Sequence, residues 1–137
     1  MSVKLTSFQW DKQDQAVSFI ETQEVISGVQ CDVYTFTDDK NKDLGIIRIE
    51  AGHKTPLQKV LKGDKTIEGY LSGKGKLVIT KATGEEKTYP VDENTKKPFE
   101  VKVRIGELMQ WHADNNSELM FYEICFPPYE DGRYENL

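Results

Sequence analysis

The chain has 137 residues, of which 37% are apolar and 30% are charged, and 18 Lys and Arg against 23 Asp and Glu give a formal net charge of -5. This length suits one compact domain, and the acidic balance excludes a nucleic-acid-binding surface, which needs clustered Lys and Arg. Two histidines, His53 and His112, are too few for a metal centre built from three imidazoles of one chain.

Short runs of β-branched and aromatic residues, separated by Gly, Asn, Asp and Pro, follow one another from residue 30 to residue 126. This pattern is typical of strands in a sandwich or barrel. Helix is a minor expectation, for which residues 13–24 are the best candidate. The expected strands, in chain order, are residues 31–37, 45–49, 66–71, 76–80, 86–91, 99–104, 108–112 and 119–126.

The segment from Lys76 to Val91 predicts a hairpin, because two strand-like runs flank a short polar turn that contains Gly84. Glycine adopts positive φ without steric cost, which a tight turn requires.

The two cysteines, Cys31 and Cys125, are far apart in the sequence and form no metal-binding spacing. We interpret them as reduced thiols in the core, because free cysteine is usually buried. The N-terminal residues contain no apolar run of signal-peptide length, and no segment is long enough to cross a bilayer. The sequence therefore predicts a cytoplasmic protein without membrane partners.

Two stretches share an ordered spacing of glycine and polar residues. The first begins at Gly52 and contains Glu68 and Gly75 with six residues between them; the second begins at Gly106 and contains His112 and Asn116. Both resemble the conserved motifs of the cupin superfamily. The proline stop after residue 126 also looks like the end of a cupin barrel.

The resemblance covers residues 45–128, the expected cupin core. It implies a single all-β domain, an antiparallel double-stranded jelly-roll β-barrel, over residues 1–137. Residues 1–30 would add an N-terminal arm or an extra strand. A homodimer packed sheet to sheet is also implied, and it would cover apolar residues on the outer face of a strand.

In metal-dependent cupins two histidines and a glutamate of the first motif, with the histidine of the second, bind one divalent metal. Here the two histidine positions fall on Gln58 and Val60, and Glu68 and His112 remain. Gln58, Glu68 and His112 are therefore the candidate ligands of a degenerate metal site, in which a neutral amide replaces imidazole poorly.

Alternation along the strands groups possible site residues by face. Glu68 and Tyr70 share one face of their strand, and Gln110 and His112 share one face of theirs. Either all four line a polar cavity, as the cupin resemblance favours, or they face solvent over a conventional core.

Three further residues complete the candidate set. Arg48 could anchor an anionic ligand group or form an ion pair with a nearby carboxylate. Tyr122 and Trp111 could stack against a sugar, although large aromatic residues in strands usually belong to the core.

Two functions remain open. The first is a cupin-like protein that binds a small polar ligand, a sugar or small carboxylate, through Arg48, Gln58, Tyr70, Gln110 and Tyr122. The second is a small cupin isomerase, epimerase or lyase in which Glu68 and His112 act as a general acid and base or as the remnant of a metal site.

Overall fold

The computed structural model describes residues 4–137, which form strands and no helix. The strands are β1 (Ser7–Trp10), β2 (Gln13–Ile26), β3 (Val29–Phe36), β4 (Asp39–Ile49), β5 (Gln58–Val60), β6 (Lys65–Gly73), β7 (Gly75–Thr80), β8 (Glu86–Val91), β9 (Glu100–Val103), β10 (Leu108–Ala113), β11 (Leu119–Phe126) and β12 (Tyr134–Asn136). The prediction of an all-β chain is confirmed.

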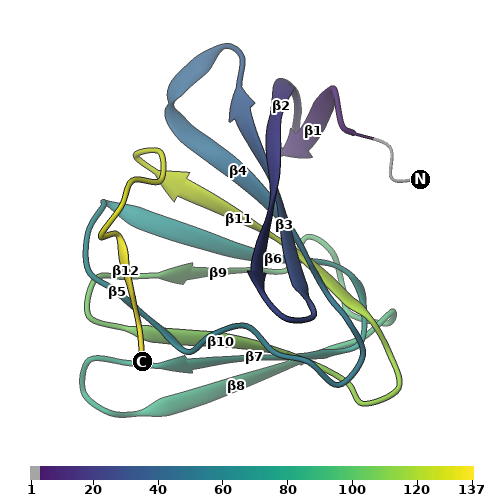
Figure 1. The fold of residues 1–137 in the computed structure, drawn as a ribbon, viewed down its shortest axis with the longest axis vertical. Coiled ribbons are helices and arrows are strands. Elements are labelled where there is room, and N and C mark those ends of the chain that lie inside the picture. Colours follow the sequence, from purple (N-terminus) through teal and green to yellow (C-terminus); the bar gives the residue numbers. More distant parts are fainter. Residues whose placement is uncertain (1–3) are drawn as a thin grey trace.

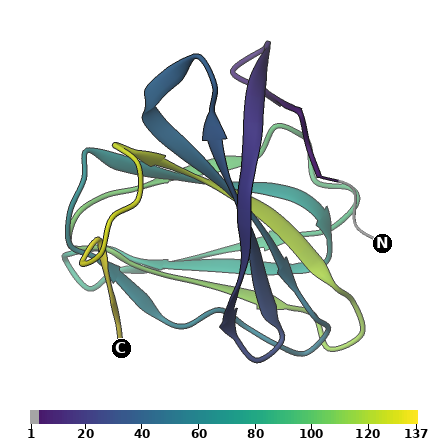
Figure 2. The same ribbon diagram turned by 45° about the horizontal axis from the view of Figure 1, so that its top comes forward.

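The strands form two antiparallel sheets that face each other (Figure 1). The larger sheet has seven strands in the order β1-β2-β3-β4-β11-β6-β9, and the smaller has five in the order β12-β5-β10-β7-β8. Figure 2 shows the same barrel with the long strand β2 crossing in front of it. Because strands from distant parts of the chain alternate within each sheet, the expected jelly-roll barrel is confirmed.

An apolar core fills the space between the sheets. Trp111 of β10 stacks on Phe121 of β11, with ring centroids 4.5 Å apart, and both rings are buried. Leu77 and Leu119 are fully buried beside them. Apolar side chains from both sheets therefore pack against one another inside the barrel.

A second apolar cluster covers the outer face of the seven-stranded sheet. Phe8 of β1 packs edge-on against Tyr122 of β11 at a centroid distance of 5.1 Å, and Val17 of β2 belongs to the same cluster. Ile67 and Leu71 of β6 pack against it. The apolar residues on this outer face are thus covered by the chain's own N-terminal strands.

Residues 13–24 are not helical, so that minor expectation is wrong. They belong to β2, whose fourteen residues pair with β1 and β3. Residues 13–16 pair with β1 and residues 17–26 pair with β3, and Val17 gains burial that an isolated helix would lack. By contrast the β7–β8 hairpin is confirmed, and Gly84 has the expected positive φ of 93°.

The described residues contain no helix that is long and apolar enough to cross a membrane.

Candidate functional site

Two glutamates lie side by side in the middle of the seven-stranded sheet. Glu68 of β6 is directly opposite Glu123 of β11 in the antiparallel register. Side chains of such a pair point to the same face of a sheet, here the face inside the barrel. Glu68 is buried with 1% of its surface exposed, and Glu123 is half-buried.

Hydrogen-bond donors from three strands hold the two carboxyl groups. Trp111 Nε1 donates to Glu68 Oε1 at 2.9 Å, and the Tyr134 hydroxyl donates to Glu123 Oε1 at 3.0 Å. The Cys125 thiol donates weakly to the same Glu123 oxygen at 3.5 Å. Glu68 Oε2 is buried without a donor among the described residues, and its neighbour is the Glu123 carboxyl group.

Burial is the largest of the effects that raise the pKa of Glu68 well above its usual value, followed by the charge of Glu123 and a hydrogen bond between the two side chains. The hydrogen bond from Trp111 acts in the opposite direction and is weaker. The protonated form of Glu68 is therefore favoured, because its proton can bridge to Glu123 and two adjacent buried anions are avoided.

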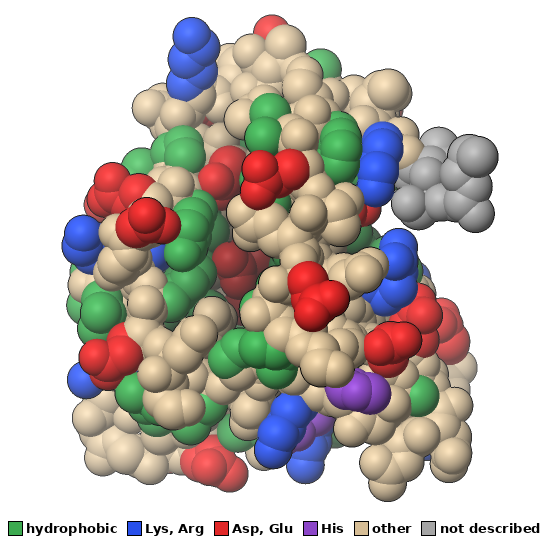
Figure 3. Space-filling model, viewed as in Figure 1, with side chains coloured by type: hydrophobic (Ala, Val, Ile, Leu, Met, Phe, Trp, Pro, Cys, Tyr) green, Lys and Arg blue, Asp and Glu red, His purple; other side chains and the backbone are tan. Residues whose placement is uncertain are grey.

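A cavity of about 270 Å³ opens beside this pair, between the seven-stranded sheet and the segment that contains β5 and the C-terminal residues. Val29, Val33, Ile47 and Phe121 contribute apolar walls, and Glu123 contributes a carboxyl group. In Figure 3 acidic atoms lie at the bottom of a hollow near the centre of the face, bordered by apolar side chains. The cavity is thus an apolar pocket with an acidic end.

Asp43 of β4 adds a second carboxyl group to the cavity wall. It accepts a hydrogen bond from the Tyr129 backbone N at 2.8 Å. Burial raises the pKa of Asp43, and the charge of Glu123 raises it further. The Cys31 thiol lies in the same wall, and its pKa is raised to about 12, first by burial and then by nearby carboxylates of which Glu123 is the strongest.

Gly45 leaves space in front of Glu123. It is the direct partner of Glu123 on β4, and it lines the cavity. A Cβ atom at position 45 would lie 3.1 Å from Cys31 Sγ, so a side chain there would enter the space that the cavity now occupies.

The C-terminal segment closes one side of the cavity with Tyr129 and Tyr134. It is held by Arg133, which is 1% exposed and donates to backbone oxygens of Lys65, Phe126 and Pro127 at 2.7, 3.3 and 2.9 Å. The C-terminal segment lies outside β6 and β11, and it therefore forms a separate part of the cavity wall.

No protein-family model and no curated protein sequence matches this chain. Solved structures do resemble it. A cupin-2 domain protein from Rhodospirillum rubrum superposes with a TM-score of 0.63 at 12% identity, over 100% of this chain and 83% of that protein. The nucleoside dehydratase Pac13 from Streptomyces gives a TM-score of 0.61 at 13% identity, over 85% of this chain and 83% of Pac13.

The chain has a cupin fold. CapF, the capsular polysaccharide assembling protein of Staphylococcus aureus, gives a TM-score of 0.67 at 12% identity, over 86% of this chain and 32% of CapF. The chain thus spans about a third of the length of CapF. At these identities the likeness concerns the fold of this chain and not its activity.

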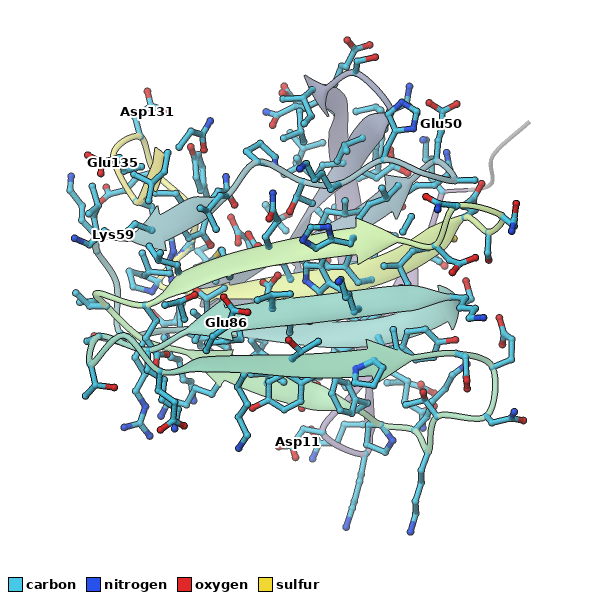
Figure 4. The ribbon with its side chains drawn as sticks, turned by 90° about the horizontal axis from the view of Figure 1, so that it is seen from below. Asp11, Glu50, Lys59, Glu86, Asp131 and Glu135 are labelled. Atoms are coloured by element: carbon cyan, nitrogen blue, oxygen red, sulfur yellow. The ribbon has the colours of Figure 1, made fainter. Side chains whose placement is uncertain are left out.

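Within this cupin barrel, the expectation that Gln110 and His112 point inwards with Glu68 is wrong. On β10 the buried residues are Met109, Trp111 and Ala113, so Gln110 and His112 lie on the outer face of the five-stranded sheet. Figure 4 looks onto that face, where Lys59 marks β5 and Glu86 marks β8. The larger apolar side chains occupy the interior, and the parity of the strand moves His112 away from Glu68.

The outward His112 is partly buried and lies near two lysines. Burial lowers its pKa, and the positive charges of Lys76 and Lys54 lower it further. Gln110 Nε2 donates to the Thr55 backbone oxygen at 2.8 Å. Neither side chain belongs to the cavity. His53, the other histidine, is exposed.

The remaining candidates are also spread over the cupin fold. Gln58 lines the cavity, and its Nε2 donates to Asn136 Oδ1 at 3.1 Å. Arg48 lies outside it and pairs with Glu118 at 3.7 Å. Tyr70 is buried in the inner core and donates its hydroxyl to the Gly73 backbone oxygen at 2.7 Å.

Tyr122 is part of the outer apolar cluster, so its expected place in a ligand site is wrong. Its hydroxyl donates a short hydrogen bond to Glu100 Oε2. The ring passes over Gly69, where an added Cβ would lie 2.0 Å from Tyr122 Cζ, and only glycine permits this approach.

The residues of this barrel do not fit the expected degenerate metal site. Among residues 4–137 no three His, Cys, Asp or Glu side chains gather as metal ligands. Glu68 contacts the inner side of β10 through Trp111, whereas His112 lies on the outer side of that strand. The Gln58 amide is hydrogen-bonded to Asn136.

Glu123, Asp43 and Tyr134 were missed as candidates by reasoning from the sequence. The sequence contains one signal for Glu123, since it is the single charged residue in the apolar strand Leu119–Phe126. An ionisable residue in such a run is buried at a cost unless it has partners. The partnership with Glu68 depends on register between β6 and β11, which no local pattern shows.

Proposed function

We propose that this protein binds a small polar organic molecule in the cavity beside Glu123. The observation that carries the proposal is an apolar cavity of about 270 Å³ that converges on a few polar groups, Glu123, Asp43 and Gln58. Such a combination is the general character of small-molecule sites.

The size of the cavity supports a small ligand. Ligand pockets usually enclose about 300 to 1,000 Å³, and this cavity, at about 270 Å³, lies just below that range. A single sugar ring is therefore a better match than an oligosaccharide or a dinucleotide.

The chemistry of the walls favours a sugar over a small carboxylate. The cavity wall contains Asp43 and Glu123, and a bound carboxylate would add another negative charge in an environment of low dielectric. Sugar hydroxyl groups can donate to these carboxylates, while the faces of Phe121 and Tyr134 offer apolar contact to the ring.

An isomerase, epimerase or lyase activity is a second candidate. It would use Glu68 and Glu123 in place of the expected Glu68 and His112. Glu68 has a raised pKa and lies opposite Glu123, which reaches the cavity. In this role Glu123 would exchange a proton with the ligand and Glu68 would hold the proton. Deuterium uptake by a sugar in heavy water, abolished in Glu123→Gln, would support it.

Binding is tested with a substitution at the rim of the cavity. Val25 on β2 lines the cavity and is 39% exposed, whereas Ile105, which follows β9, is 56% exposed and is not part of the wall. Val25→Trp is expected to abolish the rise in Tm that a panel of monosaccharides produces in the unmodified protein, because an indole would fill the entrance.

The matched control is Ile105→Trp, which introduces the same ring outside the cavity and is expected to leave the Tm response unchanged. A Tm response that survives in Val25→Trp, or a panel of sugars and carboxylates that never changes Tm, would overturn the proposed function.

A further inference from the structure

The charged side chains around the cavity are negative. Its wall contains Asp43 and Glu123, with Glu68 directly behind Glu123, and no Lys, Arg or His is among the described residues that line it. The three ion pairs that join Lys or Arg to carboxylates in residues 4–137 involve none of these three side chains.

Arg133 is a cation whose charge acts on Asp43, and its Nη donors are already used, whereas its Nε is buried without an acceptor among the described residues. Nη1 donates to the Pro127 backbone oxygen, and Nη2 donates to the Lys65 and Phe126 backbone oxygens and to Thr66 Oγ1. Its charge offsets part of the field, but its Nη groups are directed at the backbone rather than into the cavity.

One buried acceptor still lacks a donor. Glu68 is 1% exposed, and its Oε2 atom has no hydrogen-bond donor among the described residues. A buried carboxyl oxygen without a donor is costly, and the proton that Glu68 retains relieves that cost by bridging to Glu123, so Glu123 is the member of the pair that faces the cavity.

The thiols of Cys31 and Cys125 lie in the same excess of negative charge. After burial, the charge of Glu123 is the next largest cause that raises the pKa of both Cys31 and Cys125. Asp43 contributes in the same direction at both thiols.

The carboxyl groups of Asp43 and Glu123 are close enough for one functional group of a ligand to contact both. Asp43 is the cross-strand partner of Cys125, and Glu123 is the partner of Gly45. Asp43 and Glu123 are thus diagonal neighbours on β4 and β11, whose Cβ atoms lie about 7 Å apart in such an arrangement. Gly45 places no side chain in front of Glu123.

We propose that the cavity selects a ligand that carries a protonated amine, such as an amino sugar, whose ammonium group pairs with Asp43 and Glu123. This inference rests on the proposed function, since it names the ligand class of the same cavity. Phe121, Tyr129 and Tyr134 also line the cavity, and aromatic rings attract cations to their faces. A charge-assisted hydrogen bond to a carboxylate is about twice as strong as a neutral one.

The test uses three probes that share a sugar ring and differ in charge: glucosamine, glucose and glucuronate. Calorimetry is done with the full chain at low salt and slightly acidic pH, where glucosamine is protonated. We expect glucosamine to bind at least about tenfold more tightly than glucose, and glucuronate not to bind, because each tenfold step corresponds to about 1.4 kcal/mol.

Two variants locate the selectivity. Asp43→Asn and Glu123→Gln keep a hydrogen-bond acceptor at each position and remove a charge, so each is expected to reduce the preference for glucosamine over glucose about tenfold. Glu50→Gln is the matched control, since Glu50 is a carboxylate outside the cavity, labelled in Figure 4. It is expected to change nothing.

Should either variant fail to fold, the unmodified protein still provides a test. Amide NMR signals of Gly45 and Tyr129 are expected to shift on titration with glucosamine, because both residues line the cavity. Unshifted signals during glucosamine binding would overturn the assignment of the site.

The outcomes separate the two claims. If glucose binds as tightly as glucosamine, or glucuronate binds more tightly, selection for an amine is overturned and the cavity remains a binding site. If no sugar of any charge binds, the proposed function itself is overturned.

Discussion

Glu68 is a carboxyl group in a place that suits a neutral side chain. It lies among Trp111, Tyr70 and the other residues of the inner core, and it meets Glu123 across the sheet. Its folded-state pKa is raised above the usual value of 4.5, so the folded chain binds this proton more tightly than the unfolded chain does. The resulting contribution to stability is complete below the unfolded-state pKa and is lost as pH rises through the folded-state pKa.

Glu68→Gln is therefore expected to affect stability in a pH-dependent way. Glutamine has the shape of the protonated acid, accepts from Trp111 and donates to Glu123. The free energy of unfolding should be nearly unchanged at about pH 5 and should rise by about 1 to 3 kcal/mol at about pH 8. Urea denaturation at both pH values measures the effect.

Glu86→Gln provides the control for this measurement, because Glu86 is an exposed carboxylate at the start of β8. Equal destabilisation by Glu68→Gln at both pH values would contradict the raised pKa of Glu68.

At the scale of elements, the C-terminal segment depends on one buried side chain. Arg133 donates hydrogen bonds to backbone oxygens at the ends of β6 and β11, including those of Lys65 and Phe126. In return, its own backbone oxygen accepts from the Leu61 amide at 2.8 Å. The barrel end, β12 and the wall of the cavity are joined through this residue.

Arg133→Met keeps the aliphatic bulk and removes the donors, which leaves several buried oxygens unpaired. We expect a loss of about 2 to 4 kcal/mol in the free energy of unfolding and faster hydrogen exchange at Leu61 and Asp64, whose amides bond to this region. The exposed Arg104 provides the control substitution Arg104→Met. Unchanged exchange in Arg133→Met would show that Arg133 does not hold the segment.

For the whole molecule, we propose the homodimer that the cupin resemblance implies. The outer face of the seven-stranded sheet is covered by β1 and β2, so the surface left for a partner is β2 itself, whose exposed apolar residues include Phe19, Ile20 and Ile26. Burial of such side chains is the usual driving force of association.

Light scattering of the protein is expected to give twice the chain mass of 15.7 kDa. Ile20→Lys should lower the measured mass to that of one chain, because it would bury an unpaired charge at the interface. The mass of a single chain for the unmodified protein at micromolar concentration would count against the homodimer.

Local patterns in the sequence predicted much of the fold. Runs of Val, Ile, Tyr and Phe bounded by Gly, Asn and Asp located β3, β6 to β8, β10 and β11 closely, because strand propensity and turn chemistry act over a few residues. The cupin resemblance identified the fold. The same resemblance misplaced His112, since it outweighed the simpler signal that Met109 and Trp111 are the apolar residues of that strand.

The sequence by itself determined the all-β barrel, its turns and the alternation of each strand, because these follow from backbone preferences and side-chain period. Only the tertiary structure decided which face of β10 turns inwards, that β1 and β2 cover the outer sheet, and that Glu68 meets Glu123 beside Asp43 and Tyr134. The reason is physical: register between strands far apart in the chain is set by the packing of the whole core, and the acidic cavity is a product of that register.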